Sequence, residues 1–587
     1  MPSTSTSTST LHLSSSAQAP QSKRLKTSPS FAPSTPPHPY LFHLTTVKSL
    51  TPSYNINTLT LSDVFSGSPH YIVLSNYLIQ PSFLLSTCPL LSTTPTLVLA
   101  HKLLTEGWQG YDKEAPFDPL HRNIDVHYPK LNSIFGCMHS KFALLFYAGG
   151  IRVMVTTGNF IYKDFGNMTN GIYVQDFPLK SSAEDGGGYV GGGEAHPFEK
   201  TLVDYLEVAC SEVEGCDVVR RVKMYDFRRA NATLVGSVPG KFKLGAEDGK
   251  TKWGQEKMKR ELREKVDWDE NSKVVLQFSS LGSTKEKIIS NLVETFNTTR
   301  PPPASTLPSS PSIFENFSVA QLQQKQPAII WPTVNDVASS LDSYSSGGSI
   351  PAPLKSLFDF DDGITNGPRT LTVKSHLAKM LHKWGDPSLP RTSAAPHIKT
   401  FLRYKASVSG EPSGELCWVM MSSHNFSQAS WGAVQKKGEQ LSIEHYELGV
   451  LFVEKDFWGG EGEGNKVGNE PFSNTPEHAK LGMGGIVNLT ALRRGGENVR
   501  IRVPDCCLGS GGGGGGGGRG KDAVVDLTGE SDDEDGGGGG KREDKAGVLI
   551  APMPYCIPPK KYGEGDVPWC SEFSQGIPQG VKVVTNL

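Results

Sequence analysis

The sequence predicts an α/β protein with two similar halves, and three observations favour that fold class. Apolar runs typical of β-strands occur in both halves, together with segments of helical character. A His-x-Lys motif occurs once in each half. Each motif precedes a strand that leads into a small residue, a variable residue, Asn and Phe. The same order of features twice in one chain indicates an internal repeat.

The first half is expected to become ordered near Tyr40, after a tail rich in Ser, Thr and Pro. Its apolar runs predict strands at 71–75, 96–100, 141–147 and 151–157. The pair Gly149-Gly150 between the last two runs predicts a hairpin turn. A helix is predicted at 198–209, after a Gly-rich surface insertion at 183–195.

The second half repeats the strand theme, with strands predicted at 416–422 and 448–453. The stretch 246–268 carries many charges of both signs, and residues 255–265 within it predict an exposed helix. Residues 299–311 are rich in Pro and Ser and predict a loop.

These features divide the chain into three parts. We expect a disordered tail at 1–37, an N-terminal domain at 38–235 and a C-terminal domain at 236–587, each domain carrying one motif. The C-terminal domain includes a Gly-rich, charged insertion at 508–546 that has no capacity to form a core. Apolar residues resume at Val548, so the chain is expected to return to the fold there.

Composition and charge narrow the function classes only in part. The net charge is -2 at pH 7, so global charge does not support nucleic-acid binding, although one basic groove would fit within a neutral total. The nine cysteines form no CxxC pair, which argues against a zinc site and a disulfide framework. No apolar run approaches the roughly 20 residues of a membrane helix, and the N-terminus lacks the apolar segment of a signal peptide. We therefore expect a soluble, intracellular protein without membrane contact.

The repeated motifs are His139-Ser140-Lys141 and His397-Ile398-Lys399. One such motif is weak support for a site, because a His near a Lys often arises by chance. Two copies, each followed by a strand and then by Asn159 or Asn425, are much harder to assign to coincidence. Residues i and i+2 of a strand face the same side, so each His and Lys should point together into one cleft.

These residue types suit the cleavage of a phosphodiester. The two lysines and the two asparagines can neutralise and hydrogen-bond the non-bridging oxygens. One neutral imidazole can attack phosphorus while the other protonates the leaving oxygen and later activates water. Because lysines can do the electrostatic work of a metal, and no carboxylate cluster of metal-binding spacing lies beside either motif, we expect neither metal nor cofactor.

At this point the chain resembles the phospholipase D superfamily, whose signature is HxK, four residues, then Asp. Both copies depart from it, because the Asp position holds Phe146 in the first half and Tyr404 in the second. Loss of both Asp residues with both Asn residues retained resembles the tyrosyl-DNA phosphodiesterases, a DNA-repair family within that superfamily. Further matching segments include 156–161, 277–283, 347–351, 429–432 and 446–452, and similarity extends from about residue 40 to the C-terminus.

The resemblance implies two similar α/β/α-sandwich domains related by a pseudo-two-fold axis, with one shared cleft. It makes His139 the nucleophile and His397 the general acid/base, and Glu447 an acidic residue that helps to orient the histidines. It assigns phosphate binding to four side chains, Lys141, Lys399, Asn159 and Asn425. Asn170 stands where the family often has Gln, and the resemblance implies that it contacts the substrate.

The implied substrate is a single- or double-stranded DNA 3′ end joined through phosphate to a tyrosine of a topoisomerase I peptide. Ser279-Ser280 and Gly348-Ser349 would contact the DNA backbone, where small residues with free amides suit phosphate approach. Without the resemblance, ordinary turn chemistry is the favoured explanation of both segments.

Two further segments lie outside the repeat. Val524-Val525-Asp526-Leu527 followed by an acidic block resembles a SUMO-interacting motif, in which a short strand adds to a sheet edge. The alternative is a random apolar patch in a linker. The basic cluster at 23–26 fits a nuclear import signal or a solvated patch in a tail.

The sequence thus predicts a nuclear DNA-repair phosphodiesterase, active as a monomer. Two other functions remain open. A different phospholipase D-type nuclease or lipase would be expected to keep the Asp residues, and a non-catalytic SUMO-binding scaffold would not need all six polar residues of the two half-sites.

Overall fold

The computed structural model describes residues 40–101, 122–180, 195–244, 252–301, 326–360, 370–457, 500–504, 507–508 and 548–585. The tail at 1–37, the basic cluster, the SUMO-type segment and nearly all of both Gly-rich insertions lie outside the described residues. Within these ranges, no helix is long and apolar enough to cross a membrane.

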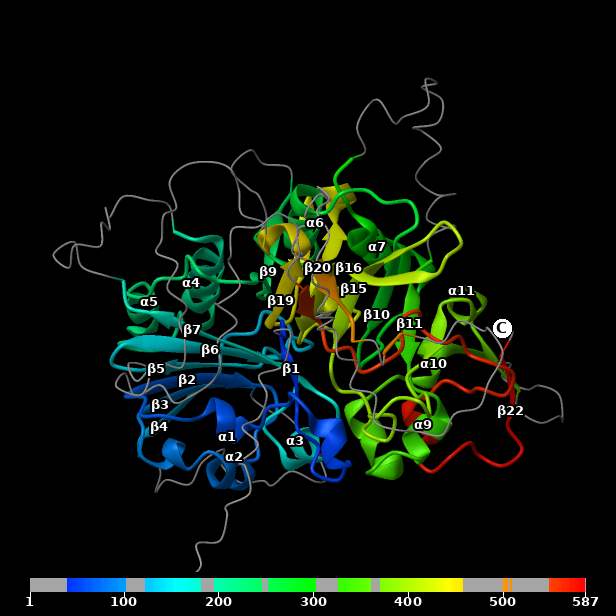
Figure 1. Ribbon diagram of the computed structural model, residues 1–587, viewed down its shortest axis with the longest axis horizontal. Helices are drawn as coiled ribbons and strands as arrows, with labels where there is room; N and C mark the ends of the chain where they lie inside the picture. Colours follow the sequence, from blue (N-terminus) through cyan, green and yellow to red (C-terminus); the bar gives the residue numbers. More distant parts are fainter. Residues whose placement is uncertain are drawn as a thin grey trace, which may run out of the picture. The chain divides into compact units, whose positions relative to one another are not determined.

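The first half forms a seven-stranded sheet in the order β1-β7-β6-β5-β2-β3-β4 (Figure 1). Strands β2, β3 and β4 are parallel, and the other neighbours are antiparallel. The bounds are His43–Leu44 (β1), Tyr71–Asn76 (β2), Thr96–Ala100 (β3), Ile124–His127 (β4), Phe142–Phe146 (β5), Gly150–Thr156 (β6) and Gly171–Pro178 (β7). Every residue of β3, β5 and β6 is buried, which is why the sequences of these strands are mostly apolar.

The second half forms a sheet along the path β14-β11-β10-β15-β16-β19-β8, with β20 and β21 attached through β16. Strands β10, β11 and β14 are parallel, and the other neighbours on the path are antiparallel. The bounds are Thr233–Ser237 (β8), Lys273–Gln277 (β10), Ala328–Trp331 (β11), Leu381–Lys383 (β14), Thr400–Ala406 (β15), Pro412–Ser422 (β16), Glu447–Val453 (β19), Arg500–Arg502 (β20) and Val548–Ile550 (β21).

The two sheets share one topology, and this confirms the repeat expected from the motifs. Each has three parallel strands followed by four antiparallel ones, so β5 corresponds to β15, β6 to β16 and β7 to β19. The boundary expected between residues 235 and 236 falls inside β8, and all of β8 belongs to the second sheet. Both sheets lie within one compact unit, His38–Leu587.

Helices cover the sheets in layers (Figure 1). The first sheet packs on one face against α4 (Pro197–Ala209) and α5 (Val218–Val222), and on the other against α1 (Leu61–Val64) and α2 (Pro81–Thr87). The second sheet packs against α6 (Gly254–Lys265) and α7 (Glu286–Asn297) on one face, while its opposite face joins the core that contains α4. Shorter helices are α3 (Tyr162–Gly166), α9 (Val334–Ala338), α10 (Leu354–Leu357), α11 (Ser375–Ala378) and α12 (Gln428–Trp431).

Helix α6 differs from the exposed helix predicted at 255–265. Met258 and Leu262 are fully buried, one turn apart, in the core of the second half. The salt bridge of Lys257 with Glu261 at 2.6 Å is also largely buried. A four-residue spacing keeps both pairs on one helix face, so mutual pairing lets two charges accompany the apolar stripe into the core.

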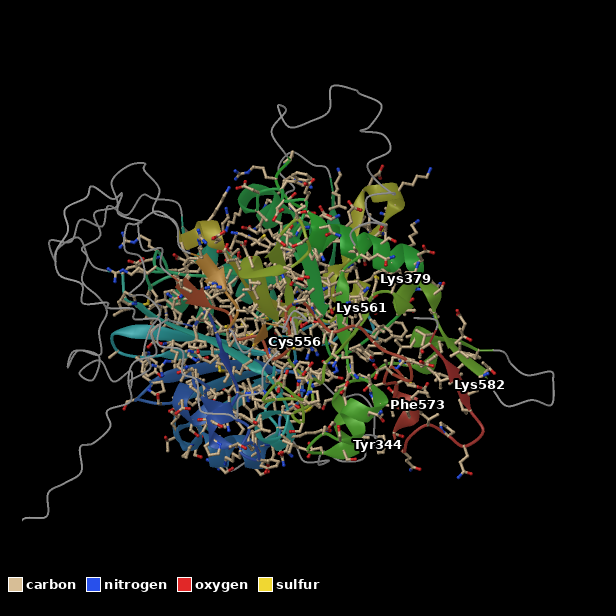
Figure 2. The ribbon with its side chains drawn as sticks, turned by 45° about the vertical axis from the view of Figure 1, so that its right-hand side comes forward. Tyr344, Lys379, Cys556, Lys561, Phe573 and Lys582 are labelled. Carbon is tan, nitrogen blue, oxygen red and sulfur yellow. The ribbon has the colours of Figure 1, made fainter. Side chains whose placement is uncertain are left out.

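The C-terminal segment returns to the fold as expected from Val548 onward (Figure 2). Tyr344 stacks on Trp569 with ring centroids 6.2 Å apart, and Phe573 meets Phe358 edge to face at 6.0 Å. Strand β22 (Lys582–Val584) completes a small sheet with β12 (Phe358–Phe360) and β13 (Thr370–Val373), and another small sheet joins β9 (Gly240–Lys243), β17 (Ala433–Gln435) and β18 (Gln440–Ile443).

Candidate active site

Each His-x-Lys motif lies in extended backbone directly before its strand, and the opposite half holds it there. The amide of His139 donates to the carbonyl of Tyr446 at 3.0 Å, just before β19. The amide of His397 donates to the carbonyl of Thr169 at 3.0 Å, just before β7. Each histidine is thus fixed by the segment that leads into the last long strand of the other half.

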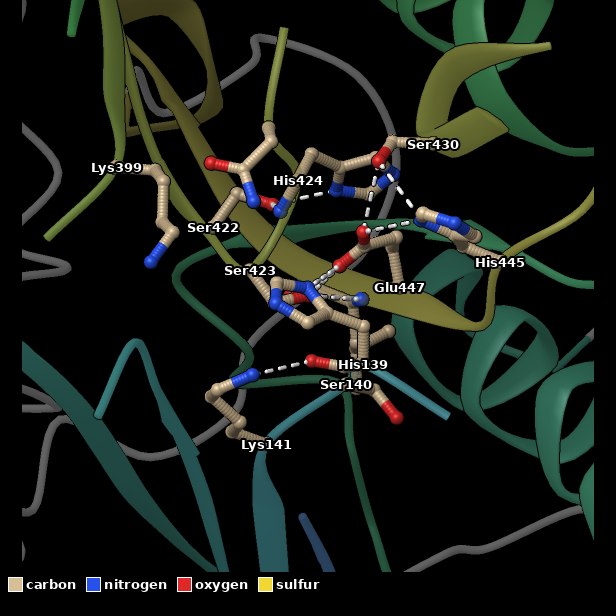
Figure 3. Close-up of polar contacts among 12 residues, drawn as sticks. His139, Ser140, Lys141, Lys399, Ser422, Ser423, His424, Ser430, His445 and Glu447 are labelled. Carbon is tan, nitrogen blue, oxygen red and sulfur yellow. Dashed lines mark hydrogen bonds and ion pairs between the residues drawn. The ribbon is translucent and has the colours of Figure 1, made fainter. Parts of the chain in front are cut away.

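Glu447, the first residue of β19, lies against His139 (Figure 3). Its Oε2 is 2.9 Å from His139 Nδ1, and Ser423 Oγ donates to the same oxygen at 2.5 Å. Burial alone would raise the pKa of Glu447, but His139 and its other partners hold that pKa well below its usual range. Because a carboxylate only accepts, Nδ1 of His139 carries the proton and Nε2 is left with its lone pair.

A second carboxylate, Asp164, lies behind His397, and no sequence motif singled it out. Its Oδ2 is 3.0 Å from His397 Nδ1 and accepts from the amide of Asn159 at 2.6 Å. Asp164 sits on α3 and is fully buried. Each half therefore supplies one carboxylate to the histidine of the other half.

This arrangement breaks the internal symmetry, and it corrects the role expected of Asn170. The register of β6 with β7 and of β16 with β19 makes Asn170 the counterpart of Glu447. Asn170 is fully buried, its Oδ1 accepts from Thr157 Oγ1 at 2.8 Å, and its Nδ2 donates to the Asp164 carbonyl at 2.8 Å. It stands behind the site as a support for α3, whereas the predicted role was contact with the substrate.

The two lysines present their ammonium groups to one region of the site. Lys141 Nζ donates to the carbonyl of His139 at 2.7 Å, and Lys399 Nζ donates to the carbonyl of His397 at 2.5 Å. Burial lowers the pKa of Lys141 to about 8. Burial and the nearby charge of Lys141 hold the pKa of Lys399 well below its usual range. Two buried cations that repel each other form a site suited to an anion.

Both histidines are held neutral in the empty site. Burial lowers the pKa of His139 to about 3 and that of His397 to about 4, although the carboxylates act in the opposite direction. His139 is therefore a free imidazole at neutral pH, the form required of a nucleophile.

The two asparagines lie next to these groups. Asn425 Oδ1 accepts from the amide of Ser279 at 3.1 Å, which turns the NH₂ end of its side chain toward other acceptors. Asn159 Oδ1 is buried without a hydrogen-bond partner among the described residues. Ser279 thus orients Asn425, and its amide is not free for a phosphate.

The remaining predicted substrate-binding residues lie on neighbouring segments. Ser280 follows β10 and is partly exposed. Gly348 is exposed and Ser349 partly exposed on the 3-10 helix Ser343–Ser349. Lys163 of α3 donates to the carbonyl of Ser345, which ties this helix to the segment that carries Asp164.

A cavity of about 860 Å³ lies elsewhere, and its lining includes Lys379 and Lys561, which are labelled in Figure 2. It is lined by the starts of β10, β11 and β14 and the end of β15, opposite the strand ends that carry the two motifs. Among the described residues, no group of three or more His, Cys, Asp and Glu side chains is placed to hold a metal ion. The paired histidines and lysines are therefore the reactive centre that the geometry supports.

This chain is similar to known proteins. The profile of the tyrosyl-DNA phosphodiesterase family matches residues 41–563. The chain belongs to this family. It is 30% identical over 551 residues to tyrosyl-DNA phosphodiesterase 1 of Arabidopsis thaliana, covering 92% of this chain and 75% of that protein. It is 28% identical over 333 residues to tyrosyl-DNA phosphodiesterase 1 of Drosophila melanogaster, covering 55% of this chain and 51% of that protein.

A solved structure supports the same fold. The crystal structure of yeast tyrosyl-DNA phosphodiesterase superposes with a TM-score of 0.54 at 15% identity, covering 90% of this chain and 99% of that one. At this identity, the likeness concerns the fold alone. The family match and the fold agree with the phospholipase D-like, two-half architecture expected from the motifs.

Proposed function

We propose that this family member hydrolyses the phosphodiester bond between a DNA 3′ end and a tyrosine of topoisomerase I, through a covalent phosphohistidine. The observation that carries the proposal is a pair of histidines, His397 buried and His139 partly buried, each backed by a carboxylate from the other half and followed by a buried lysine. Lys141, Lys399, Asn159 and Asn425 would hold the non-bridging oxygens.

In the first step, Nε2 of His139 attacks phosphorus and the bond from phosphorus to the tyrosine oxygen breaks. His397 donates its proton to the departing phenolate, and tyrosine leaves. A phenol has a pKa near 10, so its oxygen is a good leaving group and needs only partial protonation.

In the second step, His397 is neutral and accepts a proton from water. The water oxygen attacks phosphorus, the bond from phosphorus to His139 breaks, and DNA leaves with a 3′-phosphate. Glu447 keeps the proton of His139 on Nδ1 through both steps, so that Nε2 remains the reacting atom.

His397 must be protonated for the first step, whereas burial lowers its pKa to about 4 in the empty site. A bound phosphodiester anion adds negative charge beside the imidazole, and an opposite charge within about 4–6 Å raises a histidine pKa. Asp164 acts in the same direction. Substrate binding itself would thus supply the condition under which His397 takes up its proton.

The test is a gel assay with a 3′-phosphotyrosyl oligonucleotide in EDTA. The proposal predicts cleavage to a 3′-phosphate end, in both single-stranded and double-stranded DNA. Absence of cleavage would discard it. Cleavage only after a divalent metal is restored would contradict the role given to the two lysines. A matched oligonucleotide with an internal phosphodiester separates this activity from that of a general nuclease.

We also propose that Val524–Leu527 binds SUMO, a segment that lies outside the described residues. A run of β-forming residues beside acidic ones can add a strand to an exposed sheet edge. Titration of SUMO into the full chain and into a variant without 524–528 provides the test. Equal affinity of the two chains would refute the proposal.

Nuclear location and action as a monomer complete the proposal. The basic cluster at 23–26 supports nuclear import, and both half-sites of the centre come from one chain. A fluorescent fusion tests nuclear import: a nuclear signal that stays unchanged after the lysines of the cluster are replaced by Ala would reject it. The mass of a dimer in solution would reject action as a monomer.

A further inference from the structure

Glu447 is shared by two imidazoles, of which the mechanism above uses only His139 (Figure 3). His445 approaches the other carboxylate oxygen, with Nδ1 3.5 Å from Oε1. Ser430 Oγ donates to the same Oε1 at 2.8 Å and is 3.3 Å from His445 Nδ1. Glu447 thus has His139 and Ser423 on one oxygen, and His445 and Ser430 on the other.

Hydrogen-bond geometry assigns both ring protons of His445. Its Nε2 is 3.1 Å from the carbonyl oxygen of Phe135, which can only accept, so Nε2 carries a proton. The Ser430 hydroxyl has one proton and donates it to Glu447. The contact of Nδ1 with Ser430 and Glu447 therefore needs a proton on Nδ1 as well. With both nitrogens protonated, His445 is an imidazolium.

The surroundings of His445 favour that charge. Burial lowers its pKa, but the Cys137 thiol and Glu447 together raise the pKa well above 6.5. His139 lies on the far side of Glu447, with its ring centroid 6.4 Å from that of His445. The titratable groups that interact with His445 are Cys137, Glu447, His101 and His424. Cys137 and Glu447 favour the charged form of His445, and Glu447 is the one of the two that also contacts His139.

Backbone hydrogen bonds keep His445 in this place. The amide of Tyr446 donates to the carbonyl of Cys137 at 2.9 Å, and the amide of His445 donates to the carbonyl of Ala429 at 3.1 Å. The loop before β19 is therefore tied both to the first motif and to α12. A purely structural role for His445 would require only its hydrogen bond to Phe135. The positive charge beside Glu447 is not needed for that role, so it indicates a further one.

We propose that His445 is a positioning residue whose fixed positive charge neutralises Glu447, so that Glu447 orients His139 without drawing a second proton onto it. This inference rests on the proposed role of His139 as the nucleophile. Without the charge of His445, Glu447 would favour the protonated form of His139 more strongly, and a protonated imidazole has no lone pair for attack.

The test compares His445→Gln with the wild-type chain. Glutamine can still donate to the Phe135 carbonyl, but it carries no charge. The acidic limb of the kcat/KM profile for the 3′-phosphotyrosyl oligonucleotide should move to higher pH by about one unit. At pH values on the acidic limb, this shift corresponds to about a tenfold loss of kcat/KM, whereas kcat/KM on the plateau should change far less. His445→Lys should restore the wild-type limb, and His70→Gln, on an exposed histidine, serves as the control.

A second readout does not depend on catalysis. Titration of ¹⁵N-labelled imidazoles by NMR should show a higher pKa for His139 in the Gln variant than in the wild type, in chains shown to be folded by circular dichroism. Equal values in both chains, or a limb that does not move, would overturn the inference. A wild-type chain without cleavage would reject the proposed function, while the NMR comparison would still decide the role of His445.

Discussion

Replacing Asp164 with Asn would remove one negative charge from behind His397 while leaving the shape of the site intact. Oδ2 of Asp164 faces His397 Nδ1 and accepts a hydrogen bond from the amide of Asn159, whereas Oδ1 has no hydrogen-bond partner among the described residues. An Asn side chain can place its oxygen at the Oδ2 position and its NH₂ at the Oδ1 position. The change therefore isolates the charge.

The size of the effect follows from burial and distance. The side chains of Asp164 and His397 are 0% and 6% exposed, with Asp164 Oδ2 3.0 Å from His397 Nδ1, so water and salt screen the pair little. An opposite charge this close changes a pKa by about one to three units. His397 becomes a weaker base in Asp164→Asn, and removal of the proton from water should slow about 10- to 100-fold.

The assay is single-turnover cleavage with a 3′-phosphotyrosyl oligonucleotide, resolved on a denaturing gel. Release of tyrosine should slow less than hydrolysis, so a covalent adduct of protein and DNA should accumulate. Asp342→Asn is the matched control, because Asp342 accepts from Asn167 at 2.6 Å beside α3 without contacting either histidine. Wild-type hydrolysis in Asp164→Asn, with no adduct, would refute the role given to this carboxylate.

Three further predictions concern the charges of the site and the core. Inorganic phosphate should bind with uptake of protons, because an anion favours the charged forms of the lysines and histidines, and Lys399→Met should abolish most of this proton uptake. Calorimetry in two buffers of different ionisation enthalpy measures the uptake, and phosphate binding without proton uptake would contradict the lowered pKa values of these groups. The free energy of unfolding should fall by about 2 kcal/mol for each of His139 and His397 between pH 6.5 and 5, because these histidines are protonated in the unfolded chain but stay neutral in the folded one. Urea titration of His139→Gln and His397→Gln should show a smaller fall, and a fall equal to that of the wild type would rule out this explanation. Asp176→Asn should cost about 3 kcal/mol in urea unfolding, because it removes the counter-charge of the buried Arg152 guanidinium, whereas Asp217→Asn at a partly exposed pair should cost less than about 1 kcal/mol. Equal costs would show that burial does not decide the effect.

Much of the fold could be predicted from local pattern. The strands predicted at 71–75 and 96–100 correspond to β2 and β3, and that at 448–453 to β19, because buried strands are continuous apolar runs with β-branched residues. The repeat was visible because the motif, the following strand and the Asn are linked by backbone geometry in both halves. The burial of α6 could not be predicted, since it depends on residues distant in sequence that pack over Met258 and Leu262.

The carboxylates of the site show where the repeat stops being informative. Asp164 lies five residues after Asn159, and the residue five after Asn425 is Ser430, so comparison of the halves gives no reason to single out Asp164. Asn170 is likewise the counterpart of Glu447 rather than a substrate ligand. The fold is symmetrical, because both halves share one topology. The site is not, because one carboxylate comes from helix α3 and the other from strand β19.

The central claim is that phosphorus becomes bonded to His139, and one measurement tests it most directly. His397→Ala, which has no base for the second step, should trap the covalent adduct when mixed with the 3′-phosphotyrosyl oligonucleotide in EDTA. After nuclease digestion, mass spectrometry of the peptide containing residues 137–141 should locate the phosphonucleotide on His139. An adduct on any other residue, or turnover that never yields an adduct, would contradict the account.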